Sequence, residues 1–241
     1  MMMKTTNSIQ ISTVKLEARE LLNGKWIRTV CVSAILLFSF LTVTYITGLF
    51  GTGTSTQIMG FIAGLILQLL YSLLFDGGFL YFLHLYEGQE AAPGDVFALF
   101  RMQPDRFLIT GLIKSGAGLA ASLPLLAARF GYERNPSFWR IFLILWILIG
   151  GALLAAFRMA ASMTPFLLIE DSSMGPLDAL RESFALTKGF RLKLFLLLLS
   201  FLPFWLLGVF TAGIGYLWVL PYCMASVTGF RLKLKERTAV S

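Results

Sequence analysis

The chain has 241 residues, of which 57% are hydrophobic and 14% are charged, whereas soluble proteins carry about 25% charged residues. This composition excludes a soluble globular protein and predicts an all-α, polytopic transmembrane helical bundle that forms one domain over residues 1–241. The formal net charge of +7 comes from basic residues beside apolar segments, which indicates contact with anionic lipid headgroups and gives no support for nucleic acid as a partner.

Residues 8–23 predict a short amphipathic helix that ends at Asn23-Gly24. We expect it to lie flat on the inner membrane surface, and the alternative is packing beneath the bundle. The polar stretch before the first apolar segment is too long for the start of a signal peptide, so no cleavable signal is expected. The apolar positions of the helix are Ile11, Val14, Ala18, Leu21 and Leu22.

Two apolar spans follow, at 26–50 and 58–86, and a short uncharged outer segment joins them. Gly60 and Gly64 form a G-x-x-x-G pattern, which permits close helix packing. The second span is longer than one crossing requires, and Asp76-Gly77-Gly78 predicts a kink or a break within it.

The middle of the chain predicts two more spans, at 107–130 and 138–169, with a cytoplasmic connection before the first and another after the second. Each connection contains a predicted surface helix. One helix begins at Pro93-Gly94-Asp95, and its apolar face is Val96, Phe97, Leu99 and Phe100. The other begins at Gly175-Pro176, ends at Lys188-Gly189, and its apolar face is Leu177, Leu180 and Phe184.

The stretch from Leu194 to Phe230 contains 37 residues without one charge. As a single helix it would be about 55 Å long, against a hydrocarbon layer of about 30 Å. It must therefore fold back, and Thr211-Ala212-Gly213 is the best turn near its centre. This gives two further spans, at 194–210 and 214–230.

The distribution of basic residues predicts the orientation of the six spans. Of the 20 Lys and Arg, 15 fall in segments that this scheme places in the cytoplasm, so both termini are expected there. Basic residues near the inner surface are expected to contact anionic lipid. They are Lys25, Arg28, Lys188, Arg191, Lys193, Arg231, Lys233 and Lys235.

Three charged residues fall within predicted spans: Asp76, Lys114 and Arg158. The helical rise places all three in the inner half of the bilayer, where they could meet, and an isolated charge there costs at least about 2.5–3.5 kcal/mol. They predict either a ligand site in an inward-facing cavity or an ion pair that only fixes one span to another. Tyr222 follows Pro221 near the middle of the last span, and it is a further candidate to line such a cavity.

Other chemistry-bearing residues give no sign of a reaction. His84 lies near Glu87 and Glu90, but we expect an interfacial histidine rather than a metal ligand, and no metal or other cofactor. Cys31 and Cys223 are predicted at different depths, which argues against a disulfide. The HExxH, Walker A and GxSxG motifs are absent, so the chain is not expected to be an enzyme.

Several short motifs are distributed along the chain. They are Ala18-Arg19-Glu20-Leu21-Leu22-Asn23-Gly24-Lys25-Trp26, Met163-Thr164-Pro165-Phe166, Ala179-Leu180-Arg181-Glu182-Ser183, Thr187-Lys188-Gly189, Thr211-Ala212-Gly213-Ile214-Gly215 and Leu220-Pro221-Tyr222. Together they resemble a bacterial membrane family catalogued as domain of unknown function 975. The resemblance implies a six-helix integral protein of the bacterial plasma membrane, and it implies no established activity.

Two functions are compatible with these patterns. The first is binding or movement of a small amphipathic molecule, a lipid or an ion through an inward-facing cavity lined by Asp76, Lys114, Arg158 and Tyr222. The alternative is a non-catalytic interaction protein whose surface helices and basic face recruit anionic lipid, another membrane protein or a second copy. The two differ because a transporter needs a polar cavity, whereas a scaffold can be packed solid.

Overall fold

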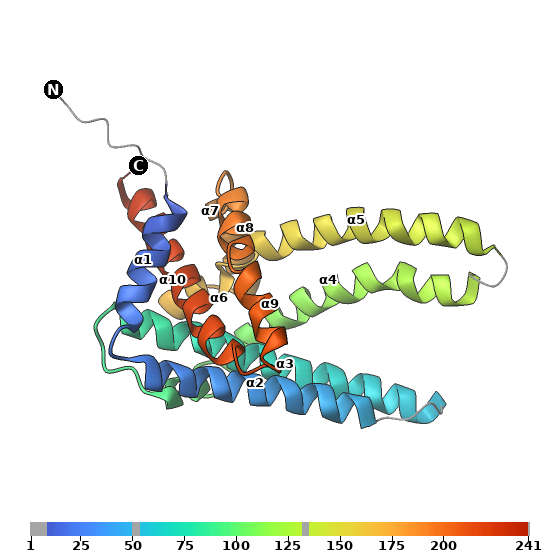
Figure 1. The fold of residues 1–241 in the computed structure, drawn as a ribbon, viewed down its shortest axis with the longest axis horizontal. Helices are drawn as coiled ribbons and strands as arrows, with labels where there is room; N and C mark the ends of the chain where they lie inside the picture. Colours follow the sequence, from blue (N-terminus) through green and yellow to red (C-terminus); the bar gives the residue numbers. More distant parts are fainter. Residues whose placement is uncertain (1–8, 50–53, 132–134, 241) are drawn as a thin grey trace. The chain divides into compact units, whose positions relative to one another are not determined.

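A computed structural model describes residues 9–49, 54–131 and 135–240, and within these residues all regular secondary structure is helical (Figure 1). The predicted outer connections at 51–57 and 131–137 lie partly outside the described residues. The helices are α1 (Ile11–Leu22), α2 (Trp26–Leu49), α3 (Thr54–Tyr86), η1 (Pro93–Phe100), α4 (Pro104–Gly131), α5 (Pro136–Ala160), α6 (Thr164–Glu170), α7 (Pro176–Leu186), α8 (Arg191–Leu199), α9 (Leu202–Phe210) and α10 (Tyr216–Val240).

Five described segments are long and apolar enough to cross a membrane, which indicates a membrane protein. They are Trp26–Leu49, Ile58–Tyr86, Pro104–Leu125, Pro136–Glu170 and Arg191–Phe210. The predicted span at 214–230 is not among them. Its helix, α10, is uncharged only as far as Phe230, and Arg231 follows directly, so a sixth crossing stays a prediction.

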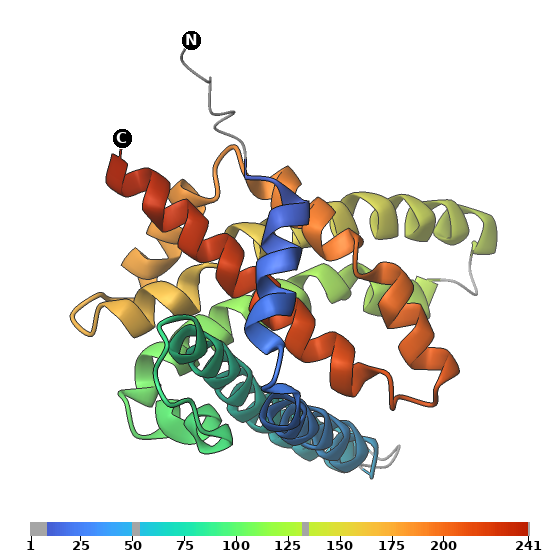
Figure 2. The ribbon, with the colours of Figure 1, turned by 60° about the vertical axis from the view of Figure 1, so that its left-hand side comes forward.

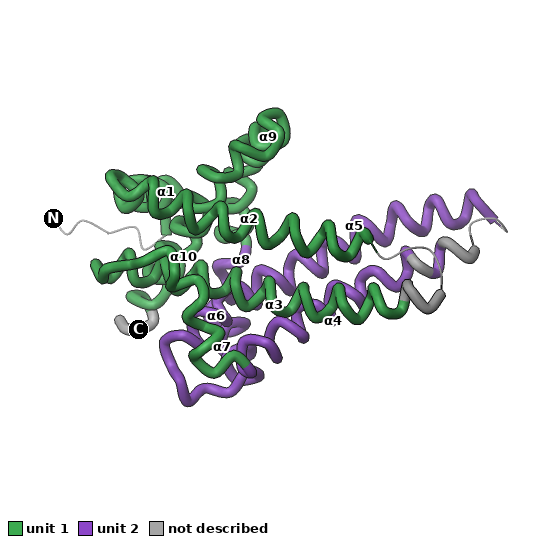
Figure 3. Tube along the Cα trace, turned by 90° about the horizontal axis from the view of Figure 1, so that it is seen from below, with its two compact units in different colours: residues 1–104, 192–241 green, residues 105–191 purple. Residues whose placement is uncertain are grey.

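The chain forms two compact units, a division that the sequence prediction of one domain does not anticipate (Figure 3). Unit 1 combines residues 1–104 with residues 192–241, and unit 2 consists of residues 105–191. Unit 1 therefore contains α1, α2, α3 and η1 from the first part of the chain, and α9 and α10 from the last part.

Unit 1 is built around α10, which packs against α1, α2, α3 and α9. Its segment from Val219 to Phe230 is buried at every position except Tyr222, so this apolar stretch has protein rather than lipid on most sides. The helices α2 and α3 run side by side along their length (Figure 1). Gly64 of α3 packs against the side chain of Thr47 there, as expected from the small-residue pattern.

The predicted amphipathic helix at 8–23 is α1, and it crosses α10 (Figure 2). Val14, Ala18 and Leu22 of α1 are fully buried, and Glu17 pairs with Lys233 of α10 at 2.7 Å. The apolar face that the sequence assigned first to the membrane surface is therefore covered by protein. This supports the alternative that α1 packs against the bundle.

Of the kink or break predicted at Asp76-Gly77-Gly78, the break is wrong, because α3 continues through all three residues. Gly77 is instead a point of close approach between α3 and η1. A Cβ atom at Gly77 would collide with the backbone carbonyl group of Val96 in η1. The glycine is thus explained by packing and does not interrupt the helix.

Two predicted spans that the sequence treated as continuous are each made of two helices. The span at 138–169 is interrupted between Ala160 and Thr164, and the span at 194–210 is interrupted between Leu199 and Leu202. Pro165 and Pro203 lie in the first turn after each interruption, where a proline removes no helical hydrogen bond.

The predicted turn at Thr211-Ala212-Gly213 is confirmed. The amide of Gly213 donates to the carbonyl of Gly208 at 2.8 Å, and Ala212 and Gly213 both have positive φ. This left-handed geometry ends α9 and allows α10 to begin at Tyr216.

Helices η1 and α7 begin at the predicted residues, and their location at a membrane surface stays a prediction. In η1, Val96 and Leu99 are buried whereas Phe97 and Phe100 are exposed. In α7, the buried residues are Ala179 and Ser183, and Leu177 is 55% exposed. The small side chains of Ala179 and Ser183 let α7 come close to the end of α5. The large apolar residues of α7 therefore do not lie at this contact.

We predict that Gly77→Ala destabilises unit 1 by about 1–3 kcal/mol, because the added methyl group must displace the backbone of η1. Gly48→Ala in α2 is the matched control, since a Cβ there meets nothing within 4 Å. Thermal unfolding of the purified protein in detergent measures both variants. Equal stability of the two variants would show that η1 moves freely on α3.

Candidate functional site

The four predicted ligand residues are divided between the two units. Asp76 on α3 and Tyr222 on α10 belong to unit 1, whereas Lys114 on α4 and Arg158 on α5 belong to unit 2. Each unit is therefore described by itself, and a meeting of all four residues stays a prediction. Asp76 is 5% exposed, so its carboxyl group is buried within unit 1.

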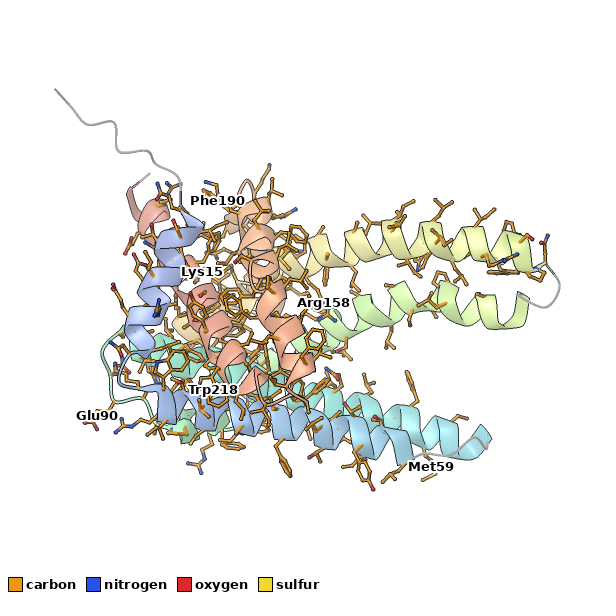
Figure 4. All side chains as sticks on the ribbon, viewed as in Figure 1. Lys15, Met59, Glu90, Arg158, Phe190 and Trp218 are labelled. Carbon is orange, nitrogen blue, oxygen red and sulfur yellow. The ribbon has the colours of Figure 1, made fainter. Side chains whose placement is uncertain are left out.

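In unit 2, the cation of Arg158 lies near Lys114. Arg158 points from α5 toward α4 (Figure 4), and its guanidinium lies 3.7 Å from where a Cβ of Gly118 would be. Lys114 precedes Gly118 by four residues, so the two positions share one face of α4. Arg158 also lies in the last turn of α5, where the helix dipole favours a positive charge.

A hollow of about 290 Å³ lies between α4 and α5, and it starts at the same Gly118. Trp146 spans the two helices by donating its indole N–H to the carbonyl of Ala121 at 2.9 Å. The lining is almost wholly small or apolar, which suits a hydrocarbon chain. It consists of Gly118, Ala121, Ser122, Leu125, Trp146, Ile147, Gly150, Gly151 and Leu154.

The interruption between α5 and α6 is stabilised by Ser183 of α7. Its hydroxyl donates to the carbonyl of Ala160 at 2.6 Å and accepts a hydrogen bond from the amide of Met163 at 3.2 Å. Arg106 of α4 donates to the carbonyls of Asp171 and Met174 and so holds the segment after α6. Hydrogen bonds from Ser173 lower the pKa of the Asp171 carboxyl group. Hydrogen bonds on both sides of the interruption thus hold the backbone near Arg158 in place.

In unit 1, Tyr222 lies against Lys15 of α1. The Tyr222 hydroxyl donates to the Lys15 carbonyl at 3.2 Å. The Lys15 ammonium donates to the hydroxyl of Ser200 at 3.2 Å and lies 4.6 Å from the centre of the Phe201 ring. The Lys15 ammonium therefore bonds to Ser200, which lies between α8 and α9. The neighbouring aromatic ring favours its positive charge.

Burial lowers the pKa of the Lys15 ammonium below its ordinary value of 10.5, and the nearby Cys223 acts in the opposite sense. Lys15 and Ser200 are 185 residues apart, so local spacing gave no signal of this contact. Within unit 1, the hydroxyl of Tyr222 is thus bonded to α1, the helix that crosses α10.

The single histidine of the sequence, His84, pairs with Asp95. His84 Nδ1 lies 3.2 Å from the carboxylate of Asp95, and the same oxygen accepts from the amide of Ala92 at the start of η1. Among the described residues, no group of three or more His, Cys, Asp or Glu is placed to hold a metal ion. Cys31 and Cys223 are both free thiols.

The residues expected to contact anionic lipid have different surroundings. Lys25, Arg28, Lys188 and Lys235 are exposed. Arg191 donates to the carbonyl of Phe184, Lys233 pairs with Glu17, and Lys193 is half-buried. Arg231 is only 3% exposed, so its side chain lies inside the protein. Lipid contact at these positions stays a prediction.

Comparison with protein families finds that the model described as "Protein of unknown function (DUF975)" matches residues 3–238, nearly the whole chain. Comparison with curated proteins and with solved structures finds no match.

We predict that Lys15 makes stability rise with pH at the alkaline end. Because its pKa is lowered on folding, the folded state binds fewer protons than the unfolded chain between that lowered pKa and 10.5. The free energy of unfolding of the wild type relative to Lys15→Met should therefore increase as pH rises through this window. Unfolding in detergent from neutral pH to 10.5 measures it, with Lys25→Met as the control for loss of an exposed lysine. A flat difference between wild type and Lys15→Met would contradict the prediction.

Proposed function

The chain belongs to the DUF975 family of proteins of unknown function, and we propose that it binds an amphipathic molecule with an anionic head, such as a lipid, and holds it in unit 2. The head would lie at Lys114 and Arg158, and the apolar tail would lie in the hollow between α4 and α5. The observation that carries this proposal is that the hollow begins at Gly118, the residue beside Arg158.

The charge of the head follows from the two cations. Lys114 and Gly118 share a face of α4, and the Arg158 guanidinium lies over Gly118. Two positive groups at one end of an apolar hollow create a positive potential, which favours a negatively charged group there. A guanidinium offers a planar pair of donors that matches a carboxylate or a phosphate. An anionic head therefore complements this end of the hollow.

The apolar part of the ligand follows from the lining and the direction of α4. From Lys114 the helix continues through Gly118 and Ala121 to Leu125, so the hollow extends away from the cation in one direction. In the proposed orientation, this direction runs from the inner surface toward the middle of the bilayer. The ligand would thus lie as an inner-leaflet lipid does, with its head inward.

The proposal includes a topology. We place the chain in the bacterial plasma membrane as a multi-pass protein with six spans and both termini in the cytoplasm. The excess of Lys and Arg in the predicted cytoplasmic segments supports this orientation. Asp76 and Tyr222 remain candidates to line an inward-facing cavity, since one is a buried carboxyl and the other lies beside an interrupted span. Interrupted spans accompany ligand sites in many transporters.

Native mass spectrometry of the protein released from lipid nanodiscs tests the proposal. We expect a stoichiometric anionic amphiphile on the wild type, and we expect Arg158→Gln to reduce its occupancy about tenfold, because a charged hydrogen bond is lost. Gly118→Leu should have the same effect by filling the start of the tail site. Asp76→Asn in the same assay tests for a contribution from unit 1.

Gly116→Leu is the matched control on α4, because a Cβ atom there meets nothing within 4 Å. It should retain the bound amphiphile. If the wild type carries only bulk phospholipid, unchanged in Arg158→Gln and Gly118→Leu, the residues at this site are structural and the proposal is wrong.

A second function is favoured by one observation, the exposed aromatic pair on η1. Phe97 and Phe100 are 48% and 38% exposed, and their ring centres lie 6.3 Å apart. The rings lie on a segment that is not one of the five candidate spans. They would suit the recruitment of another membrane protein, as in the scaffold alternative.

We predict that a scaffold role depends on these rings. Phe97→Ser/Phe100→Ser should abolish cross-links to protein partners in intact cells, while Met102→Ser, at an exposed position after η1, serves as the matched control. The buried residues Val96 and Leu99 remain in place, so η1 should stay folded. An unchanged pattern of cross-links in the double variant would exclude this surface as the recruiting one.

A further inference from the structure

A second hollow, of about 440 Å³, lies in unit 1 at the elbow between α1 and α2. Its size falls within the range of small-molecule sites, which is about 300–1,000 Å³. Three of its lining residues come from α1, the fourth directly follows that helix, and the fifth is the first residue of α2. They are Leu16, Arg19, Glu20, Asn23 and Trp26.

We infer that this hollow binds the headgroup of an aminophospholipid, a lipid that carries one phosphate and one primary ammonium group. The inference goes beyond the ligand proposed for unit 2, and it uses only the proposed location of the N-terminus in the cytoplasm. It depends on the charges of the lining and on the position of the hollow beside a candidate span.

The charges of the lining match a zwitterion. Arg19 supplies a guanidinium, which binds a phosphate through two parallel hydrogen bonds. Glu20 supplies a carboxylate, which accepts hydrogen bonds from an ammonium group. Neither side chain has a hydrogen bond or an ion pair with any other residue that the structure describes, although Glu17 and Lys15 on the same helix are both engaged. Their hydrogen-bonding capacity is therefore available to a ligand.

The position of the hollow favours a lipid over a soluble zwitterion. Trp26 begins a candidate membrane span, and tryptophan is enriched at the level of the headgroups. Leu16 is 58% exposed and Ile27, next to Trp26, is 83% exposed, so apolar surface faces outward beside the charges. A lipid would cover this surface with its glycerol and acyl groups, which a soluble ligand does not have.

The ammonium group distinguishes this lipid from its commonest competitors. Choline has no N–H to donate to Glu20, although it could contact the face of Trp26. A glycerol headgroup has no positive charge to pair with Glu20. The hollow should therefore prefer phosphatidylethanolamine over phosphatidylcholine and phosphatidylglycerol.

The test uses the full-length protein in nanodiscs made of equal parts phosphatidylethanolamine, phosphatidylcholine and phosphatidylglycerol, with retained lipids counted by native mass spectrometry. The wild type should retain phosphatidylethanolamine over phosphatidylcholine by about fivefold to tenfold, as one hydrogen bond gives. Glu20→Gln should remove this preference while lipid is still retained, and Arg19→Met should reduce retention of both lipids.

Arg28→Met is the matched control, because Arg28 is an exposed cation of α2 that does not line the hollow. It should keep the preference. Arg158→Gln and Gly118→Leu should keep it too, which separates this inference from the ligand proposed for unit 2. Helical circular dichroism of each variant checks folding, and the swapped variant Arg19→Glu/Glu20→Arg provides a second test, since it should lower the preference without a change in net charge.

Equal retention of phosphatidylethanolamine and phosphatidylcholine by the wild type would overturn the inference. So would a preference that persists in both Glu20→Gln and the swapped variant. Retention of free phosphoethanolamine in place of the lipid would also overturn it, because the exposed Leu16 and Ile27 would then have no part in binding.

Discussion

A helix that is interrupted inside a membrane must have its freed backbone groups satisfied by the protein, because no water is present there to replace the lost hydrogen bonds. In unit 2, Ser183 of α7 meets this requirement at the interruption between α5 and α6. In unit 1, Lys15 of α1 reaches the carbonyl and hydroxyl of Ser200 between α8 and α9. In each unit, a short helix outside the candidate spans is thus tied to an interrupted span.

This requirement also determines where polar chemistry can lie. Arg158 lies in the last turn of α5, directly before an interruption, and Tyr222 lies beside another. The helical ends supply carbonyl groups that favour nearby cations, so charged residues are tolerated there at lower cost than in the middle of a continuous helix. The proposed site of the ligand head and the two interruptions therefore depend on the same feature, which is a helix end within a span.

The hydropathy of the sequence predicted the all-helical membrane fold, the spans near 26–50 and 58–86, and the turn at 211–213. It could not tell whether an apolar segment faces lipid or protein, because both environments favour the same side chains. For this reason the sequence predicts an ordinary membrane span at 214–230, although most of the apolar length of α10 is buried in unit 1. Similarly, Asp76-Gly77-Gly78 suits a helix break and close packing equally well, and only the position of Val96 decides between them.

The candidate site could be predicted only in part. Charged residues within apolar segments drew attention to Asp76, Lys114 and Arg158, since their cost in a membrane is large. Lys15 lies on an amphipathic helix, where a lysine is normally solvated, and its partners are far away in sequence. The hollows depend on how helices diverge, which is not encoded in any local pattern of residues.

Unit 1 combines the first and the last parts of the chain, so its two segments are synthesised at different times. Its first segment ends at residue 104 and its second begins at residue 192, so all of unit 2 leaves the ribosome between them. Val14, Ala18 and Leu22 of α1 are covered by α10, which is translated last. During most of translation, α1 therefore has an open apolar face beside the membrane, where lipid is the natural temporary cover. A chain that stopped before residue 192 would keep that face open permanently, and quality-control proteases could recognise it as an unfinished product.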